Sequence, residues 1–212
     1  MAFTVPLLVV THLVYVIMKI LSRSFFSRDT TLVSQELLGK IIVRVIDKDI
    51  VLVGRIVETE AYTGIHDRAS HAYGGKRVRN APLFGPVGHA YVYFIYGMYY
   101  CLNFICREPD VPAGGTLIRA VEPLAGIEYM QQQRHKHKIH DVTNGPGKLT
   151  RAFSINKTHN GIDVTKKGEL YLLDAPAIAS KDIIITPRIG ISKAADEMLR
   201  FYIKDNPFVS KK

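Results

Sequence analysis

The stretch from residue 41 to residue 62 constrains the fold of this chain most. Two runs rich in β-branched residues, IIVRVI (41–46) and IVLVGRIVETEAY (50–62), flank a short polar break at 47–49. Runs of this composition favour strands, and a short polar break between two such runs favours a hairpin. The sequence therefore predicts an antiparallel sheet whose second strand is long.

The far end of that second strand, VETEAY (57–62), places two acids and an aromatic ring on one face. Side chains alternate along a strand, so Glu58, Glu60 and Tyr62 point the same way. Carboxylates on an otherwise apolar strand need surroundings that are wet, hydrogen-bonded or chemically active. Two interpretations stay open at this point: an edge strand with solvated glutamates, or a site in which a carboxylate does chemistry.

The rest of the chain is richer in strand than in helix. A short helix is expected after Asp29, whose side chain can cap it, with Gly39 as its C-terminal stop. Further strands are expected at 90–95, 100–105, 116–123, 170–174 and 182–186. We expect an α+β fold, in which residues 18–212 form one compact domain, mainly an antiparallel sheet, with peripheral helices and a protruding hairpin.

The protruding hairpin is predicted from the residues between two of these strands. Tyr96-Gly97-Met98-Tyr99 is typical of a tight turn. A turn there puts Tyr96 and Met98 at an exposed tip, where large apolar groups mark a contact with another molecule. The alternative is one continuous bent strand that buries Tyr96. We favour the tip.

The charge of the chain favours a polyanionic partner. Lys and Arg number 28 against 19 Asp and Glu, a formal net charge of +9. Residues 1–17 carry none of these charges, so the folded body itself is basic, and Lys76, Arg77 and Arg79 gather in one Gly-rich surface segment. Charge alone leaves nucleic-acid binding and an ordinary basic surface equally open.

Residues 1–17 form a largely apolar extension. They lack the basic start of a signal peptide, and their apolar run is short for a spanning helix. We expect Met18 to be the true start of the protein and expect no membrane association.

Cys101 and Cys106 are the two cysteines of the chain, and their odd spacing points them to opposite faces of an extended segment. Unpaired thiols fit a reducing intracellular compartment. CxxC and HExxH motifs are absent, so we expect no metal.

Several motifs occur in order along the chain: VETEAY, the following His71, YVYFIYGMYYCLN, LIRAVEPLAG, NGPGKL, and PRIGIS with LRFY. With them the chain resembles the alkyladenine (3-methyladenine) DNA glycosylase family over residues 18–208. The resemblance implies an open-barrel-like sheet and an enzyme of base-excision repair without a cofactor. Such an enzyme flips alkylated or deaminated purines, such as 3-methyladenine or hypoxanthine, from duplex DNA and hydrolyses the N-glycosidic bond with a Glu-activated water. We expect a monomer, in the cytoplasm or nucleoid of a bacterium or the nucleus of a eukaryote.

The resemblance also implies catalytic roles. Glu60 corresponds to the general base that activates the water. Arg119 and the main-chain carbonyl of Ile189 correspond to the groups that hold this water. Glu58 is expected to be structural, as a partner that orients a neighbouring arginine.

Binding roles follow in the same way. Tyr62 and His71 correspond to residues that sandwich and hydrogen-bond the flipped base, Tyr93 to the ring on its other face, and Asn103 to the residue that disfavours the amino group of guanine. Tyr96 corresponds to the wedge that fills the vacated stack. The aromatic pocket wall is expected to include Tyr91, and Lys76, Arg77 and Arg79 are expected to contact the DNA backbone.

The chemistry agrees with these roles. An alkylated purine is cationic and leaves readily, so a base and a water suffice, and tyrosine faces attract a cationic lesion. With no lysine recognised in the site motifs, we expect a monofunctional glycosylase without strand cleavage. Two alternatives remain, a non-catalytic binder of damaged or single-stranded DNA and an RNA-directed hydrolase. Glu60 argues against the binder, which gains nothing from a carboxylate near phosphates.

Overall fold

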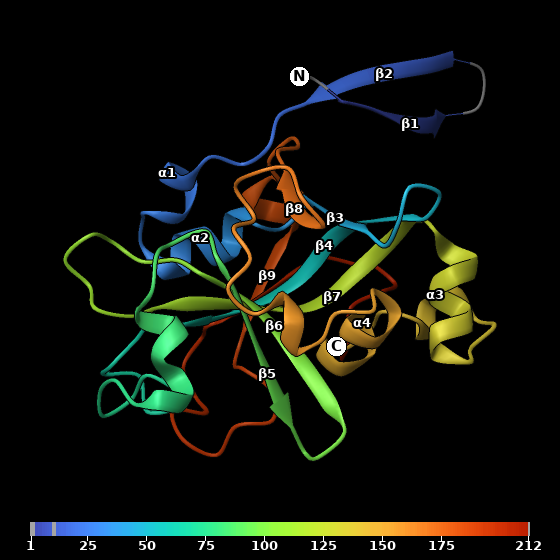
Figure 1. Ribbon diagram of the computed structural model, residues 1–212. Helices are drawn as coiled ribbons and strands as arrows, with labels where there is room; N and C mark the ends of the chain where they lie inside the picture. Colours follow the sequence, from blue (N-terminus) through green and yellow to red (C-terminus); the bar gives the residue numbers. More distant parts are fainter. Residues whose placement is uncertain (1–2, 10–11, 212) are drawn as a thin grey trace.

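A curled antiparallel sheet forms the centre of the computed structural model (Figure 1), which describes residues 3–9 and 12–211, with side chains from Met18 onward. Within that part, the eight strands of this sheet are β3 (Ile41–Val45), β4 (Val51–Tyr62), β5 (Ala90–Ile95), β6 (Tyr99–Ile105), β7 (Gly115–Ala125), β8 (Leu170–Leu173), β9 (Ile183–Thr186) and β10 (Arg200–Ile203). The strand order is β5-β6-β7-β4-β10-β9, with β3 pairing β4 and β8 pairing β3. The sheet curls into a half-barrel, as predicted.

The VETEAY strand lies in the interior of this sheet. Glu60 of β4 lies opposite Leu117 of β7 on one side and opposite Arg200 of β10 on the other. Glu58 and Glu60 are fully buried. Of the two interpretations left open by the sequence, the edge strand with solvated glutamates is therefore wrong.

Short helices surround the sheet. In the described part they are α1 (Arg23–Phe26), α2 (Thr30–Glu36), α3 (Ile127–Arg134) and α4 (Pro146–Ala152). The predicted cap of α2 is confirmed, because the Asp29 side chain accepts a hydrogen bond from the Leu32 amide at 2.8 Å. The main core contains the fully buried rings of Phe26, Phe104 and Phe153.

The β5–β6 hairpin protrudes from the body, as predicted (Figure 1). Tyr96 adopts a left-handed backbone conformation with φ 53°, which is rare for residues other than glycine. Gly97 follows with φ 68°. Tyr96 is 75% exposed and Met98 is 64% exposed. The tip prediction is confirmed, and the continuous strand that buries Tyr96 is wrong.

A second hairpin, β1 (Phe3–Val9) with β2 (His12–Met18), precedes the body. The chain then joins the main sheet through a bridge between Ile20 and Leu173. The side chains of residues 1–17 are outside the described part, so the expectation about Met18 as the start stays a prediction. No helix in the described ranges is long and apolar enough to cross a membrane.

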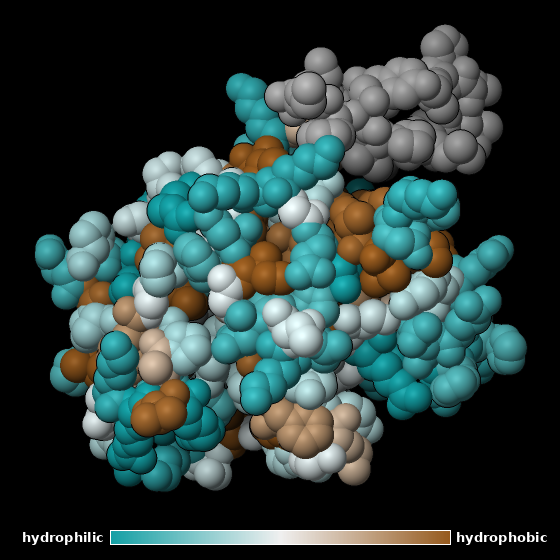
Figure 2. Space-filling view, viewed as in Figure 1, coloured by the Kyte–Doolittle hydropathy of each residue, from teal (hydrophilic) through white to brown (hydrophobic). Residues whose placement is uncertain are grey.

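The surface of the body is mixed. In the space-filling view, hydrophilic side chains cover most of the visible face, and apolar ones form separate patches (Figure 2). The exposed large apolar residues include a group on the β5–β6 hairpin: Phe94, Tyr96, Met98 and Tyr99. This hairpin is therefore the element to examine for a contact with another molecule.

Candidate active site

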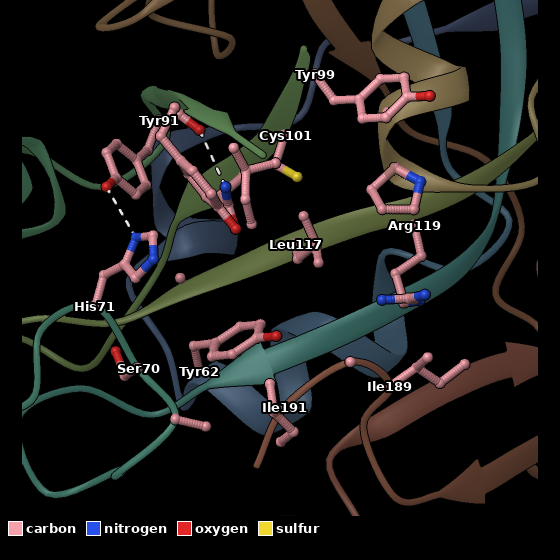
Figure 3. Close-up of a pocket in the computed structure, with 18 of the residues that line it drawn as sticks. Tyr62, Ser70, His71, Tyr91, Tyr99, Cys101, Leu117, Arg119, Ile189 and Ile191 are labelled. Carbon is pink, nitrogen blue, oxygen red and sulfur yellow. Dashed lines mark hydrogen bonds between the residues drawn. The ribbon is translucent and has the colours of Figure 1, made fainter. Parts of the chain in front are cut away.

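A cavity of about 540 Å³ opens beside the β5–β6 hairpin (Figure 3). The end of β4, the segment around residue 70, strand β7, the start of α4 and the loop after β9 enclose it. The residues that line it are Tyr62, Ala69, Ser70, His71, Leu83, Tyr91, Tyr93, Ile95, Tyr96, Tyr99, Cys101, Asn103, Gly115, Leu117, Arg119, Gly145, Pro146, Gly147, Lys148, Ile189, Gly190 and Ile191. All the predicted pocket residues and the predicted wedge are among them.

One wall of the cavity is a set of aromatic rings held against each other. The ring centroids of His71 and Tyr93 lie 4.5 Å apart, and those of Tyr91 and Tyr93 lie 5.3 Å apart. His71 Nδ1 lies 3.1 Å from the Tyr91 hydroxyl. Below them, Asn103 Nδ2 donates to the Tyr91 carbonyl at 3.2 Å. These contacts fix the orientation of the wall before any ligand arrives.

The electrostatics keep this wall neutral. Burial lowers the pKa of His71, and the nearby positive charge of Arg79 lowers it further, so the imidazole is neutral at pH 7. Burial raises the pKa of Tyr93 and of Tyr91, so both phenols keep their protons. A neutral aromatic wall can accept either a neutral or a cationic flat ligand.

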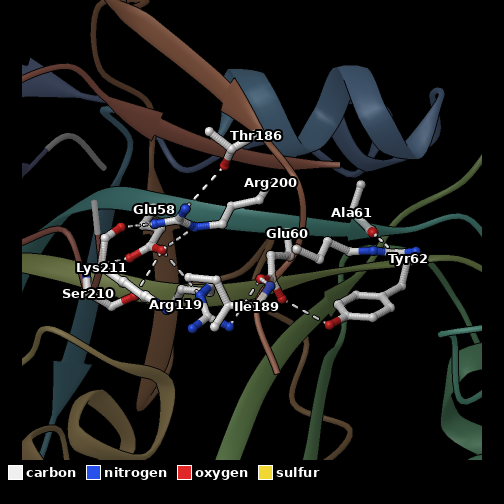
Figure 4. Close-up of polar contacts among 11 residues, drawn as sticks. Glu58, Glu60, Ala61, Tyr62, Arg119, Thr186, Ile189, Arg200, Ser210 and Lys211 are labelled. Atoms are coloured by element: carbon white, nitrogen blue, oxygen red, sulfur yellow. Dashed lines mark hydrogen bonds and ion pairs between the residues drawn. The ribbon is translucent and has the colours of Figure 1, made fainter. Parts of the chain in front are cut away.

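Glu60 contacts three residues that line the cavity, Tyr62, Arg119 and Ile189 (Figure 4). Its Oε1 accepts from the Ile189 amide at 2.7 Å and lies 3.1 Å from Arg119 Nη1. Its Oε2 accepts from the Tyr62 hydroxyl at 2.9 Å. Glu60 does not itself line the cavity, but these three partners all do. A carboxylate is thus held one layer beneath a cavity large enough for a base.

The contact with Glu60 raises the pKa values of Tyr62 and Arg119. Burial raises the pKa of Tyr62, and the adjacent Glu60 carboxylate raises it further, so the hydroxyl remains a donor. Burial alone would lower the pKa of Arg119, but the carboxylates of Glu60 and Glu58 hold it above its ordinary value. Arg119 therefore presents a permanent positive charge to the cavity.

Glu58 does not line the cavity. Its Oε1 accepts from Arg119 Nε at 3.2 Å and from Arg200 Nε at 2.6 Å. The Ser210 amide donates a hydrogen bond to Glu58 Oε2 at 2.7 Å, and the Ser210 hydroxyl donates one to Oε1 at 2.9 Å. The predicted structural role, with Glu58 as a partner of a neighbouring arginine, agrees with this geometry.

The role that the resemblance implies for the Ile189 carbonyl, holding the water, stays a prediction. The structure shows that the amide N–H of Ile189 donates to Glu60 at 2.7 Å. The amide fixes the carboxylate.

Sequence reasoning missed the pair of Arg188 and Asp67. Arg188 Nη1 and Nη2 donate to Asp67 Oδ2 and Oδ1 at 2.6 and 2.9 Å, and both side chains are fully buried. The same guanidinium donates to the Ala61 carbonyl at 2.9 Å and lies 4.8 Å from the centre of the Tyr62 ring. The pair ties the loop with Ile189 to the cavity wall. An arginine directly before Ile189 was the available signal.

Lys148 was also missed. It belongs to the NGPGKL motif and lines the cavity, where its Nζ donates to Asn144 Oδ1 at 2.8 Å. The expectation of a glycosylase without strand cleavage rested on site motifs without a lysine, and that premise is wrong.

The basic segment lies outside the cavity. Lys76, Arg77 and Arg79 are exposed, as is Val78 between them, at 97%. Arg79 is close enough to His71 and Tyr91 to lower the pKa of both. The segment therefore lies beside the aromatic wall, and its contact with DNA stays a prediction.

Among the residues with described side chains, no group of three or more His, Cys, Asp or Glu is arranged to hold a metal ion. Cys101 and Cys106 are free and buried. Burial raises the pKa of Cys106 to about 12, so this thiol is protonated at pH 7.

Comparisons with known proteins agree with this geometry. The family model described as methylpurine-DNA glycosylase matches residues 24–207. A Clostridium perfringens protein is 50% identical over 206 residues, covering 91% of this chain and 99% of its own length. A Methanocella arvoryzae protein is 48% identical, covering 92% of this chain and 98% of its own. Both are named "Putative 3-methyladenine DNA glycosylase".

The match spans most of the chain, including the strand with Glu60, the aromatic wall and the loop with Ile189. The chain belongs to the methylpurine-DNA glycosylase family.

Proposed function

We propose that this protein removes alkylated or deaminated purines from duplex DNA by hydrolysing the bond between the base and C1′ of the sugar. The damaged nucleotide is flipped into the cavity, and Tyr96 fills the space that it leaves. The rings of Tyr62 and Tyr93 enclose the base. The exposed hairpin tip beside the cavity mouth supports this path.

Glu60 acts as the general base in this proposal. It takes a proton from a water, whose oxygen forms a bond to C1′ while the electrons of the N-glycosidic bond leave with the base. A purine alkylated at N3 or N7 carries a positive charge before cleavage and leaves as a neutral molecule. A deaminated purine is neutral before cleavage, leaves as an anion and takes up a proton from the solvent. The Arg119 guanidinium and the Ile189 amide hold Glu60 in place.

One observation carries the proposal: Glu60 is fully buried, and the three residues that contact its carboxylate, Tyr62, Ile189 and Arg119, all line the aromatic cavity. A protein that only binds DNA gains nothing from a carboxylate beside its binding cavity, because the negative charge of the carboxylate repels the DNA phosphates. The arrangement favours hydrolysis over binding alone.

The test compares the wild type with Glu60→Gln on duplexes that contain 3-methyladenine, hypoxanthine or ethenoadenine. The variant keeps the size of the side chain but cannot accept a proton, so we expect the single-turnover release rate to fall by about 10²–10⁴. Lesion binding should persist. Glu128→Gln, an exposed acid on α3, is the matched control.

Two outcomes would contradict this function. Release at the wild-type rate by the Glu60→Gln variant would exclude Glu60 as the base. Tight lesion binding by a wild type that releases no base would identify a damage binder instead.

We also propose that the enzyme leaves the DNA strand intact, because the Nζ of Lys148 is held by Asn144 Oδ1 at 2.8 Å. A strand-cleaving glycosylase forms a Schiff base between an amine and C1′. Lys148 lines the cavity, so it is the residue to test. Borohydride treatment during turnover should give no protein–DNA cross-link, and a cross-link that disappears in Lys148→Gln would assign a lyase activity to this lysine.

A further inference from the structure

The hydrogen bonds around Glu58 extend from the catalytic centre to a distant part of the chain. Glu58 is fully buried, and the side chains of Arg119 and Arg200 are 9% and 5% exposed. Two carboxylates and two guanidiniums thus share one buried cluster (Figure 4). Such a cluster is stable only if every charge keeps its partner and its geometry.

Arg119 bridges the two carboxylates. Its Nε bonds Glu58 at 3.2 Å and its Nη1 bonds Glu60 at 3.1 Å. A guanidinium is planar, so two contacts on different carboxylates fix its rotation. The direction in which Arg119 presents its charge to the cavity therefore depends on Glu58, which does not touch the cavity.

Glu58 is itself fixed from the opposite side. Ser210 donates once to each carboxylate oxygen, at 2.7 and 2.9 Å, and thereby sets the plane of the carboxylate. Arg200 donates to Oε1 at 2.6 Å and also bonds the Lys211 carbonyl. Glu58, Arg200 and Ser210 form what is here termed the carboxylate clamp.

The segment that carries Ser210 is anchored on the sheet. Phe208 is buried, packs with Val57 and Ala120, and lies 4.8 Å from the His140 ring. Its amide bonds Asn206 Oδ1 at 2.9 Å. Val57 and Ala120 directly adjoin Glu58 and Arg119 in the sequence. The anchor thus holds Ser210 in register with the residues that it contacts.

We propose that the carboxylate clamp is a positioning device of the catalytic centre, through which Ser210 sets the orientation of Arg119 and thereby of the Glu60 carboxylate. The inference rests on the proposed function, because it treats Glu60 as the base. It gives segment 206–211 a role in the rate of base release and none in lesion binding. Ser210 and Glu58 are positioning residues, since neither touches the cavity.

The test measures Ser210→Ala, which loses the hydroxyl donor but keeps the backbone amide donor. We expect the single-turnover release rate to fall about tenfold, since a hydrogen bond to a charged group is lost, with unchanged affinity for lesion duplex. Ser210→Thr restores the hydroxyl and should restore the rate. Ser180→Ala, at an exposed position, is the matched control.

A stability control separates positioning from simple loosening. Val43→Ala removes buried apolar groups from a separate core cluster and should lower the melting temperature without changing the rate. The buried residues of this cluster are Ile41, Val43, Val53, Tyr171 and Leu173. A Ser210→Ala rate equal to that of the wild type would overturn the clamp and leave the glycosylase function standing. A rate loss matched by Val43→Ala at equal melting temperature would overturn it as well.

A second readout needs no activity. The Arg119 Nε–H signal, assigned in ¹⁵N-arginine-labelled protein by comparison with Arg119→Lys, should exchange with solvent faster in Ser210→Ala than in the wild type. If the wild type releases no base, the proposed function is wrong, and this signal alone decides the clamp. Faster exchange supports it, and equal exchange overturns it.

Discussion

Tyr62 has two separable roles at the residue scale. Its ring lines the cavity and lies under the Arg188 guanidinium, while its hydroxyl donates to Glu60 at 2.9 Å. We expect the ring to bind the damaged base and the hydroxyl to position the Glu60 carboxylate. A substitution that removes one of them and keeps the other can measure each.

Tyr62→Phe keeps the ring and removes the donor. We expect lesion affinity to stay close to that of the wild type and the release rate to fall about tenfold, because Glu60 loses one of the bonds that position it. Single-turnover kinetics and equilibrium binding measure the two quantities, with Tyr73→Phe as the exposed control. An unchanged rate with weakened binding would show that the hydroxyl serves lesion binding and does not position Glu60.

Asp67→Asn tests the pair that the sequence did not indicate. It removes the fully buried charge partner of Arg188, which then keeps only the half-exposed Glu197 at 3.1 Å, so we expect a loss of about 3–5 kcal/mol in the free energy of unfolding. Glu36→Gln breaks the half-exposed pair with Arg28, where the loss should be about 0–1 kcal/mol. Urea denaturation measures both, and equal losses would contradict the importance given to burial.

At the scale of elements, the two ends of the β5–β6 hairpin differ. The turn, Tyr96, Gly97 and Met98, is exposed, whereas the base of the hairpin contributes Phe104 to the main core and Asn103 to the cavity. The tip can therefore change without disturbing the core. We expect stability to depend on the base of the hairpin and DNA recognition on its tip.

Tyr96→Ala tests this separation. Because the side chain is 75% exposed, we expect the melting temperature to stay the same, while the release rate from duplex DNA falls at least about tenfold through loss of the wedge. Val51→Ala, at an exposed position of β4, is the control. A lower melting temperature together with a normal rate would mean that Tyr96 is a structural residue.

The short 3-10 segment at 157–159 gives a pH dependence. Burial lowers the pKa of His159, and Arg44 lowers it further, against smaller opposing effects of the Asn156 backbone and the Glu169 carboxylate. As the pH falls below about 6.5, His159 takes up a proton in the unfolded chain but not in the folded protein. The contribution of His159 to the free energy of unfolding is therefore complete above that pH and is lost as the pH falls below it.

His159→Gln should flatten this loss between pH 7 and pH 5, as measured by the urea midpoint at each pH. The same slope in variant and wild type would show that other groups cause the acid sensitivity. His137→Gln, an exposed histidine, is the control.

At the scale of the whole molecule, we expect only some of the basic residues behind the net charge of +9 to contact DNA. The exposed segment with Lys76, Arg77 and Arg79 lies beside the aromatic wall. Replacing all three with glutamine should reduce the slope of log affinity against log salt by up to about 2.7, since each phosphate contact contributes about 0.9. Lys48→Gln and Lys181→Gln, exposed elsewhere, should leave the slope unchanged. An unchanged slope in the triple variant would place the DNA elsewhere.

Local patterns predicted much of this molecule. The β3–β4 hairpin, the capped α2 and the exposed Tyr96 follow from residues close in sequence, where propensity and turn chemistry decide. The contacts of Arg188 with Asp67 and of Ser210 with Glu58 join residues 121 and 152 positions apart. No local sequence pattern predicts such contacts. VETEAY is an interior segment because β10, far along the chain, pairs with it on the side opposite β7.

The interior position of β4 has a consequence for genetics. A selection for inactive alleles would recover two kinds of protein. Polar substitutions at the buried apolar positions of VETEAY, Val57 and Ala61, would mostly give insoluble protein, because the strand with Glu60 is also the strand on which β3, β7 and β10 assemble. Substitutions at the hairpin tip would give soluble protein that fails at its substrate, so expression level alone would sort the two classes.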